Sequence, residues 1–576
     1  MPPTSAVEMW SKVRDGFVAV VIGLVVQLLI AGIQSLLEDS NVDFPPSVVA
    51  MAGVFAVLLM CGCFVPGVDG FYRRHLQGPA NLLNRHMSIG FTIPFVMICR
   101  SSLANPGTIG LIIVCFLLTG IFNTILSYAF ALPLQSLMSR WTYRSEETDM
   151  ADEHHAKGES EEKKQPSPKN LEEGRANLTV PTSHLSTSTM VFPLASRSST
   201  PAEKMLDDHT PAEETLPISL RTATYHFLLR NPMLILSWLL LLVIGLPLRY
   251  ATQHDTFLAT SLLFAVWFTT LAIQCGVKTT SSLSPTICTL LSGLFNPVLW
   301  TSLAMIAYIF VDCAISHRSL AAMLDTLQTH NTLSELILRK ATGRPLPTSS
   351  SDAMAAGDIA LSILNAGLVS WGLKLYEYRR QLLSRAGLTV FSVSSLLALG
   401  NVALGPLFAH ALGLGPASRD LAFAARSVTL ALGSPVMSTL GGDAGLNATM
   451  VVVSGIIFQM GLGFGAGAWL EGKVNAVVGR WRGAKGEDAE AQPQQQQPEA
   501  SCCTTTPNTD DPTTVAAGVT IGINAAAMGT AYLYEVNSDA APYSALSMMA
   551  LGIMTVVFSS IPPLAVWVVG QVSSAV

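Results

Sequence analysis

Long apolar runs separated by polar segments make up most of this chain. About twelve of them approach or exceed the roughly 20 residues that a helix needs to cross a bilayer. They are too long for the strands of a membrane barrel, so the pattern predicts an all-α polytopic membrane protein of about twelve helices. The runs lie at about 17–37, 46–66, 88–104, 108–130, 232–250, 256–275, 286–313, 357–376, 387–412, 447–470, 515–534 and 545–570.

Two long polar segments divide the chain. Residues 144–216 combine a charged stretch with a tail rich in Ser, Thr and Pro, and residues at about 483–513 are rich in Gln and Thr. Such compositions cannot bury enough apolar surface to fold, so we expect both segments to be disordered. The chain then divides into a four-helix membrane domain at 1–143, a polar loop at 144–216 and a second membrane domain at 217–576, which contains the shorter loop.

The composition agrees with membrane insertion. Half of the 576 residues are hydrophobic and 12% are charged, and the mean hydropathy is +0.45, whereas soluble proteins carry about 25% charged residues. We expect a multi-pass protein of the plasma membrane or of an organelle inner membrane. The net charge of −6 carries little information, because much of it lies in the polar segments. The expected partners are lipid, a small solute and, as an open alternative, further copies of the chain; no nucleic-acid partner is expected.

Basic residues near the ends of the runs predict the orientation, because cytoplasmic loops carry an excess of Lys and Arg. The rule places both termini and the segment 144–216 on the inside face, on the basis of Arg73, Arg74, Arg85, Arg140 and Arg144.

The segment 424–442 cannot be an ordinary span. Two basic loops, at 379–385 and 473–485, both belong on the inside face. If 424–442 crossed the membrane together with the runs before and after it, the second loop would fall outside. A re-entrant segment resolves this, and its glycines and proline predict two short helical pieces that meet near Gly433–Pro435.

Polar residues at membrane depth are the candidate binding site, because such residues are costly and usually functional. We expect Arg426, Ser427, Thr429 and Ser434 of the broken segment, together with Asn365 and Asn524, to bind substrate. The guanidinium fork suits a carboxylate, and a helix N-terminus beside it adds free N–H groups.

Structural alternatives remain open for several of these residues. Arg426 could be a positive anchor at the interface, and Asn524 could make only an interhelical hydrogen bond. Asp358 and Lys374 lie at the two ends of the run 357–376, where charged side chains are tolerated near the headgroups.

No sequence pattern indicates an enzyme. Phosphate-binding loops, dinucleotide fingerprints and Cys/His spacings typical of metal ligands are absent. We therefore expect no catalytic activity, no cofactor and no bound metal.

Several segments resemble known membrane families. "RSVTLALGSPVMSTLGG" (426–442), "GVTIGINAAAMGTAYLYE" (518–535) and "LVSWGLKLYEYRRQLLSR" (368–385) resemble, in order and spacing, signatures of the LrgB/CidB family. In residues 1–143, which we call the first block, "FPPSVVAMAGVFAVLLM" and "ANLLNRHMSIGFTIPFVMI" resemble helices of the partner family, LrgA/CidA. The chain departs from the pattern at Ala525-Ala526, where the LrgB family has Ser-His, so that histidine is absent here.

The resemblance implies an LrgA-like domain at 1–143 fused to an LrgB-like domain at 217–576, which is the plan of the plastidal glycolate/glycerate translocators. It implies a secondary transporter of small organic anions such as glycolate or glycerate, coupled to a proton or sodium. A holin-like pore or a non-transporting membrane regulator is the alternative. By analogy with other carriers, we expect two inverted repeats, centred on Asn365–Tyr376 and Gly518–Tyr532.

The predicted orientation can be tested at a glycosylation sequon. Asn177-Leu178-Thr179 lies in the segment 144–216, which is expected on the inside face, so Asn177 should carry no glycan after expression in a eukaryotic cell. The mobility of the chain before and after endoglycosidase treatment checks this. A glycan on Asn177 would reverse the orientation.

Overall fold

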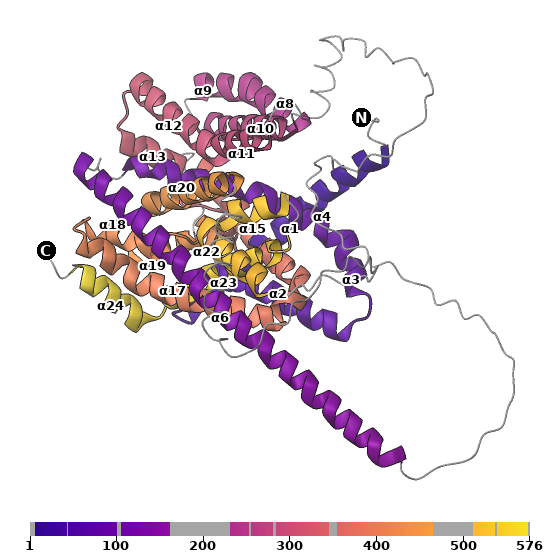
Figure 1. Cartoon of the computed structure of the whole chain (residues 1–576). Coiled ribbons are helices and arrows are strands. Elements are labelled where there is room, and N and C mark those ends of the chain that lie inside the picture. The colour runs from indigo at the N-terminus through magenta and orange to yellow at the C-terminus, as the bar shows by residue number, and fades with distance from the viewer. Residues whose placement is uncertain are drawn as a thin grey trace, which may run out of the picture.

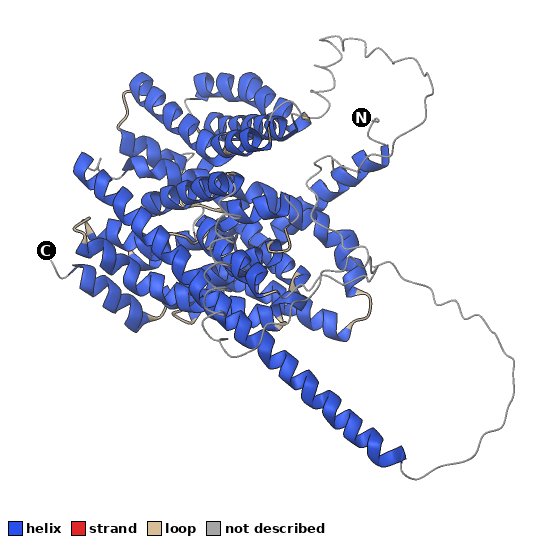
Figure 2. Cartoon of the chain, viewed as in Figure 1, coloured by secondary structure: helices blue, strands red, loops and turns tan. Residues whose placement is uncertain are grey.

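The computed structural model is built from helices (Figure 1). It describes residues 6–42, 44–100, 105–161, 231–252, 255–279, 284–344, 354–464, 511–535 and 538–573. Within these ranges every regular element is a helix, and no strand is present (Figure 2). The sequon at Asn177 and the polar segment at 483–510 lie outside the described residues.

The first block consists of three long helices and a series of short ones. Its elements are α1 (Ala6–Asp39), α2 (Pro46–Phe64), α3 (Val68–Phe71), the π-helix η1 (Tyr72–Leu76), α4 (Gln77–His86), the 3₁₀-helix η2 (Met87–Phe91), α5 (Thr92–Val96), the 3₁₀-helix η3 (Met97–Arg100) and α6 (Pro106–Glu161). α6 continues past residue 143 into the polar segment, of which residues 162–216 lie outside the described ranges.

The second block begins with α8 (Pro232–Leu239), the π-helix η4 (Leu240–Gly245), α9 (Leu246–Thr252), α10 (Thr256–Thr279), α11 (Pro285–Leu294), α12 (Pro297–Ser316), α13 (Leu320–Leu327) and α14 (Leu333–Ala341). It continues with α15 (Ala356–Glu377), α16 (Arg379–Leu382), α17 (Arg385–Ala411), α18 (Ala417–Leu421), the 3₁₀-helix η5 (Ala422–Ala425), α19 (Leu430–Leu440), α20 (Ala444–Gly463), α22 (Pro512–Glu535), α23 (Ala541–Ser559) and α24 (Pro562–Ser573).

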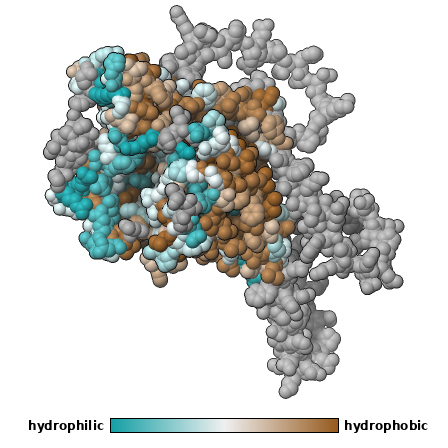
Figure 3. Space-filling view, turned by 90° about the vertical axis from the view of Figure 1, so that its left-hand side faces the viewer, coloured by the Kyte–Doolittle hydropathy of each residue, from teal (hydrophilic) through white to brown (hydrophobic). Residues whose placement is uncertain are grey.

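The expectation of about twelve membrane helices is confirmed. Among the described residues, 12 helical stretches are long and apolar enough to cross a membrane. The chain is therefore a multi-pass integral membrane protein. Large hydrophobic side chains such as Phe17, Ile121 and Val243 are exposed on the outer helices α1, α6 and η4, where lipid would cover them. Figure 3 shows hydrophobic residues over the right of one face and hydrophilic residues gathered at its left.

Three predicted spans are less regular than expected. The run 88–104 is a succession of short pieces, η2, α5 and η3, and the basic stretch before it is helical rather than a loop. The run 286–313 is divided at Asn296, whose side chain accepts hydrogen bonds from the N–H groups of Val298 and Leu299 and so caps α12. The last run, 545–570, ends at Ser559 because two prolines begin the separate helix α24.

α15 is the most enclosed of the candidate spans, with 78% of its most apolar window buried, against 17% for α6. Asp358 at its start is fully buried and accepts hydrogen bonds from the N–H groups of Ala355 and Thr329 at 3.0 and 3.1 Å. Lys374 near its end pairs with Glu377 at 2.7 Å. Both charged residues therefore find partners near the ends of the helix, but both are buried within the protein rather than exposed near the headgroups.

Residues 417–443 form a re-entrant segment, which we call the first hairpin. α18 and η5 lead in, and α19 leads out. The backbone N–H of Asp443 donates to the carbonyl oxygen of Ser418 at 2.8 Å, so the two ends of the segment meet. This is the geometry that the sequence predicts for a segment that enters and leaves on one side.

α22 also folds back on itself, which the sequence did not predict. Ala526 has φ 48° and ψ −137°, which breaks the helix. A Cβ on Gly529 would lie 2.9 Å from Ile521 Cγ2, whereas residues eight apart in a continuous helix are separated by about 12 Å. We call residues 512–535 the second hairpin.

The two hairpins enter from opposite ends of α17, which is long enough to cross the membrane. Ala417 of the first hairpin packs in one cluster with Leu407, near the C-terminal end of α17. Tyr534 of the second hairpin hydrogen-bonds to Tyr378, close to the N-terminal end of α17. Opposed broken segments of this kind are the relation that inverted repeats require. The repeat predicted around α15 stays a prediction: α15 is continuous, and the broken element that opposes the second hairpin is the first hairpin.

The position of α24 is inconsistent with placing both the C-terminal end and the basic loop at 379–385 on the inside face. Val568 and Val572 of α24 pack with Leu407 and Leu421. α24 therefore lies at the end of α17 that is opposite to the basic loop at 379–385. If that loop is inside, α24 is outside.

The backbone at Ala526 leads to a stability prediction. Its φ and ψ lie in a region that glycine adopts freely and alanine does not. Ala526→Gly should raise the free energy of unfolding by about 1 kcal/mol, and Ala526→Val should lower it by about 1–3 kcal/mol. Unfolding by SDS titration measures both.

The matched control is Ala516→Gly in the helical arm of the same hairpin. Glycine in a helix interior costs about 1 kcal/mol relative to alanine, so this variant should be destabilised. If Ala526→Gly and Ala516→Gly lost equal stability, the backbone at Ala526 would carry no strain.

Candidate functional site

The first hairpin breaks at residues 426–429, which are not helical and separate η5 from α19. The predicted break at Gly433–Pro435 is wrong, because α19 runs continuously through both residues. Gly433 serves close packing instead: a Cβ there would lie 2.7 Å from the Asn447 side-chain oxygen.

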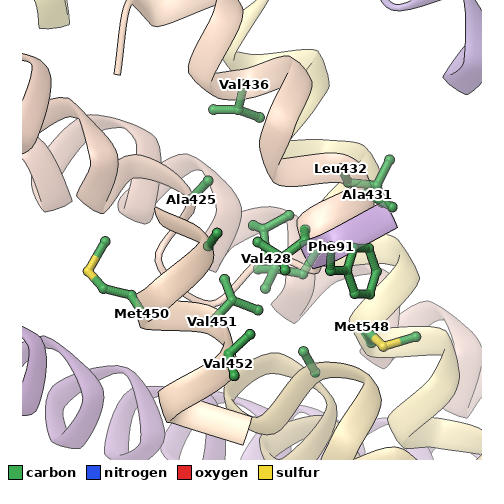
Figure 4. Packing of buried hydrophobic residues seen from close by; sticks show 14 of the residues in the cluster. Phe91, Ala425, Val428, Ala431, Leu432, Val436, Met450, Val451, Val452 and Met548 are labelled. Carbon is green, nitrogen blue, oxygen red and sulfur yellow. The ribbon is translucent and has the colours of Figure 1, made fainter. Parts of the chain in front are cut away.

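Asn447 of α20 explains how the break is tolerated. Its side-chain amide donates hydrogen bonds to the carbonyl oxygens of Ala425 and Ala422, at 2.8 and 3.3 Å. These carbonyls lie where the helix ends, so they need partners that lipid cannot supply. The apolar residues of the break pack inward: in Figure 4, Val428 and Leu432 lie around Phe91 of η2.

Arg426 is the first residue of the tip of the first hairpin, and it is only 5% exposed. Its Nη1 donates a long hydrogen bond of 3.4 Å to the carbonyl oxygen of Phe116, and the guanidinium carbon lies 5.5 Å from the centre of the Phe116 ring. Its Nη2 has no hydrogen-bond partner, and no acidic side chain lies within 4 Å in the described part of the chain. Among the described residues, Arg426 is therefore a buried cation without a counter-charge.

A cavity of about 300 Å³ lies beside this guanidinium. It separates α6 from α20 and the hairpin tip. The residues that line it are Phe116, Leu117, Gly120, Ile121, Thr124 and Ile125 of α6, Ser454, Ile457 and Phe458 of α20, and Arg426. Gly120 makes room for the cation, since a Cβ there would lie 3.0 Å from Arg426 Nη1.

The tip of the second hairpin reaches the wall of this cavity through Asn524. The Ser454 hydroxyl, in the cavity wall, donates to the Asn524 carbonyl oxygen at 2.9 Å. The Asn524 side-chain oxygen accepts from the Asn123 amide at 3.1 Å, and its side-chain nitrogen donates to the Ser127 hydroxyl at 3.2 Å. Because Asn123 and Ser127 belong to α6, this residue joins the two blocks of the chain.

The structure brings together only part of the predicted site. Arg426 lines the cavity and Asn524 supports its wall. Ser427 and Thr429 are buried at the break, where their hydroxyl oxygens have no hydrogen-bond partner in the described structure. Ser434 on α19 and Asn365 on α15 are half-buried and are not among the residues that line the cavity.

Sequence reasoning missed the contribution of α6. Asn123 and Ser127 lie four residues apart inside a long apolar run, which places them on one face of the helix. Two polar groups at this spacing were a usable signal, because polar side chains within a membrane helix usually find partners inside the protein. Ser454 had no comparable signal.

The second block can be compared with known proteins. Residues 287–471 and 508–565 match the model of the LrgB-like family. Over these residues the chain belongs to the LrgB-like family. Both hairpins, α20 and Arg426 lie within the LrgB-like region.

The match does not include the first 286 residues, so the likeness of residues 1–143 to the LrgA/CidA family stays a prediction. No curated protein and no solved structure matches the chain.

The contact between Asn123 and Asn524 predicts energetic coupling between the first block and the LrgB-like region. A double-mutant cycle with Asn123→Ala, Asn524→Ala and the double variant should give a coupling free energy of about 0.6–1.7 kcal/mol, as for interhelical hydrogen bonds in membranes. SDS unfolding of the full chain measures it. The control is Asn105→Ala, exposed before the start of α6, which should show no coupling with Asn524→Ala.

Proposed function

We propose that this protein is a secondary carrier of small organic monocarboxylates, and that Arg426 binds the carboxylate group. The observation that carries the proposal is the unpaired guanidinium, buried at a hairpin tip and facing a cavity. A buried cation is strongly destabilising unless an anion compensates it. No acidic side chain of the described chain does so, and a bound carboxylate would.

The backbone around Arg426 favours an anion as well. The N–H groups of Leu430 and Ala431, the first two of α19, have no acceptor within the helix, whereas those of Leu432 and Gly433 donate to the Thr429 carbonyl. The hydroxyl oxygens of Ser427 and Thr429 are buried without hydrogen bonds in the described structure. A helix N-terminus of this kind attracts negative charge. The broken segment therefore offers several donors close to the cation.

The two opposed hairpins support a carrier over an enzyme or a fixed channel. Carriers with alternating access place their substrate near the midplane, between broken segments that enter from the two sides. Here the tips of both hairpins reach one cavity, through Arg426 and through the contact of Ser454 with Asn524. Movement of one hairpin or the other would open the cavity to one side at a time.

The resemblance to the plastidal translocators favours glycolate and glycerate as first substrates to test. Coupling to a proton or to sodium belongs to the proposal. His410 and Asp420 lie 3.1 Å apart at the entrance of the first hairpin, and this histidine–carboxylate contact is the proposed site for a coupling proton. A holin-like pore or membrane regulator is the alternative, and it would need a water-filled passage. α22 and α23 pack against each other, and the most apolar window of each is 67% buried, which favours a closed carrier over such a passage.

Substitution of Arg426 tests the proposed function. Loss of a charged hydrogen bond costs about 1.5–3 kcal/mol, so Arg426→Ala should lower the uptake efficiency of labelled glycolate or glycerate by at least roughly tenfold. The uptake efficiency of Arg426→Lys should lie between those of the wild type and Arg426→Ala, because an ammonium group keeps the positive charge but loses the bidentate geometry of the guanidinium. Uptake into proteoliposomes with a matched amount of inserted protein measures the effect.

The control is Arg100→Ala, which removes an exposed arginine paired with Asp325 at 3.0 Å and should change uptake by less than about twofold. Normal uptake by correctly inserted Arg426→Ala would make Arg426 a structural anchor. Solute-independent currents across the same membranes would favour the pore.

A further inference from the structure

The cavity beside Arg426 is polar at one point and apolar nearly everywhere else. Six of its lining residues are hydrophobic, namely Phe116, Leu117, Ile121, Ile125, Ile457 and Phe458. A small acid with a hydroxyl on every carbon beside the carboxylate presents little apolar surface to such a wall. The lining therefore carries information about the body of the ligand, beyond its carboxylate.

The hydroxyl groups of Thr124 and Ser454, which also line the cavity, offer no hydrogen-bond donor to a ligand. Thr124 donates its hydrogen to the carbonyl oxygen of Gly120 at 2.8 Å, and Ser454 donates to that of Asn524 at 2.9 Å. Each oxygen keeps only the capacity to accept. Arg426 is thus the one side chain of the wall with a free donor, and the substrate hydroxyl groups would compete for two acceptors.

The volume of the cavity sets how much of a ligand it can enclose. A cavity of about 300 Å³ holds about ten water molecules at the density of the liquid, or a ligand of about ten non-hydrogen atoms. A short monocarboxylate fits this space, whereas a membrane fatty acid has about twice as many atoms.

We propose that this cavity selects monocarboxylates with an aliphatic body of about four to eight carbons over hydroxylated acids of similar size. The inference rests on the proposed function of the same site and names its preferred substrate class. The carboxylate binds at Arg426, and the aliphatic body packs against the α6 and α20 side chains. The cavity opens on the outer surface, since Ile121, Ile125 and Ile457 are exposed, so such an amphipathic acid could also reach it from the bilayer.

Binding to the full chain in lipid nanodiscs tests the selectivity directly. Isothermal titration should show affinity rising roughly fourfold for each added CH₂ from butyrate to hexanoate, as expected for apolar burial. Glycerate should bind at least roughly fivefold more weakly than butyrate, because its hydroxyl groups lose water. Arg426→Ala should remove the binding of all of them.

Filling the cavity provides a second test. Ile125→Trp should weaken hexanoate more than tenfold and butyrate less than threefold, because the added ring occupies the space of the longer chain. Ile113→Trp, at an exposed position of the same helix away from the cavity, is the matched control and should change neither. Palmitate binding more tightly than octanoate would identify a membrane fatty acid as the occupant and overturn the proposal.

The outcomes separate this inference from the proposed function. Uptake of glycerate that depends on Arg426 and is not inhibited by hexanoate would overturn the selectivity and leave the carrier standing. Binding in the expected order without uptake of any acid would overturn the carrier and leave the selectivity standing. An altered oligomer mass for Ile125→Trp, without a change in binding, would mean that a second copy covers this cavity, and it would also overturn the selectivity.

Discussion

Backbone groups released by a broken helix must find partners within the protein, because lipid offers none. This constraint shapes the interior of the molecule. α20 supplies partners to both breaks: Asn447 binds the carbonyl groups at the first hairpin, and Ser454 binds the Asn524 carbonyl at the second. A single helix therefore holds both tips, and a displacement of either one must be accommodated along α20.

The first block completes the cavity rather than standing beside it. α6 crosses the front of the molecule (Figure 1) and packs against α17 and α22. It provides more than half of the cavity lining, the space at Gly120 and the amide of Asn123. The LrgB-like region alone would leave Arg426 exposed on that side, so the two blocks form one structural unit around the cavity.

Composition and periodicity were enough to predict the helical membrane fold and the re-entrant segment, because hydropathy and loop charge report directly on burial in lipid. They could not locate the breaks. Gly433 and Pro435 suggested a break in the first hairpin, yet Gly433 lies within a continuous helix and allows the Asn447 side chain to pack closely against it. The break in the second hairpin falls at Ala526, although alanine is a good helix former. Arg426 was predicted from its charge. Asn123 and Ser454 depend on contacts between distant segments, which one sequence does not reveal.

The bond between Asn123 and Asn524 joins residues that are 401 positions apart. Because both residues belong to one chain, the first block and the LrgB-like region meet in an intramolecular step. The probability of that contact depends on the length of the connecting segment, whereas for two separate proteins it would depend on the concentration of each. Doubling the length of a flexible connector costs only about 0.6 kcal/mol. The polar composition of the stretch between α6 and α8 predicts such a connector, so this stretch can lengthen, shorten or change its sequence during evolution with little effect on how the two halves meet.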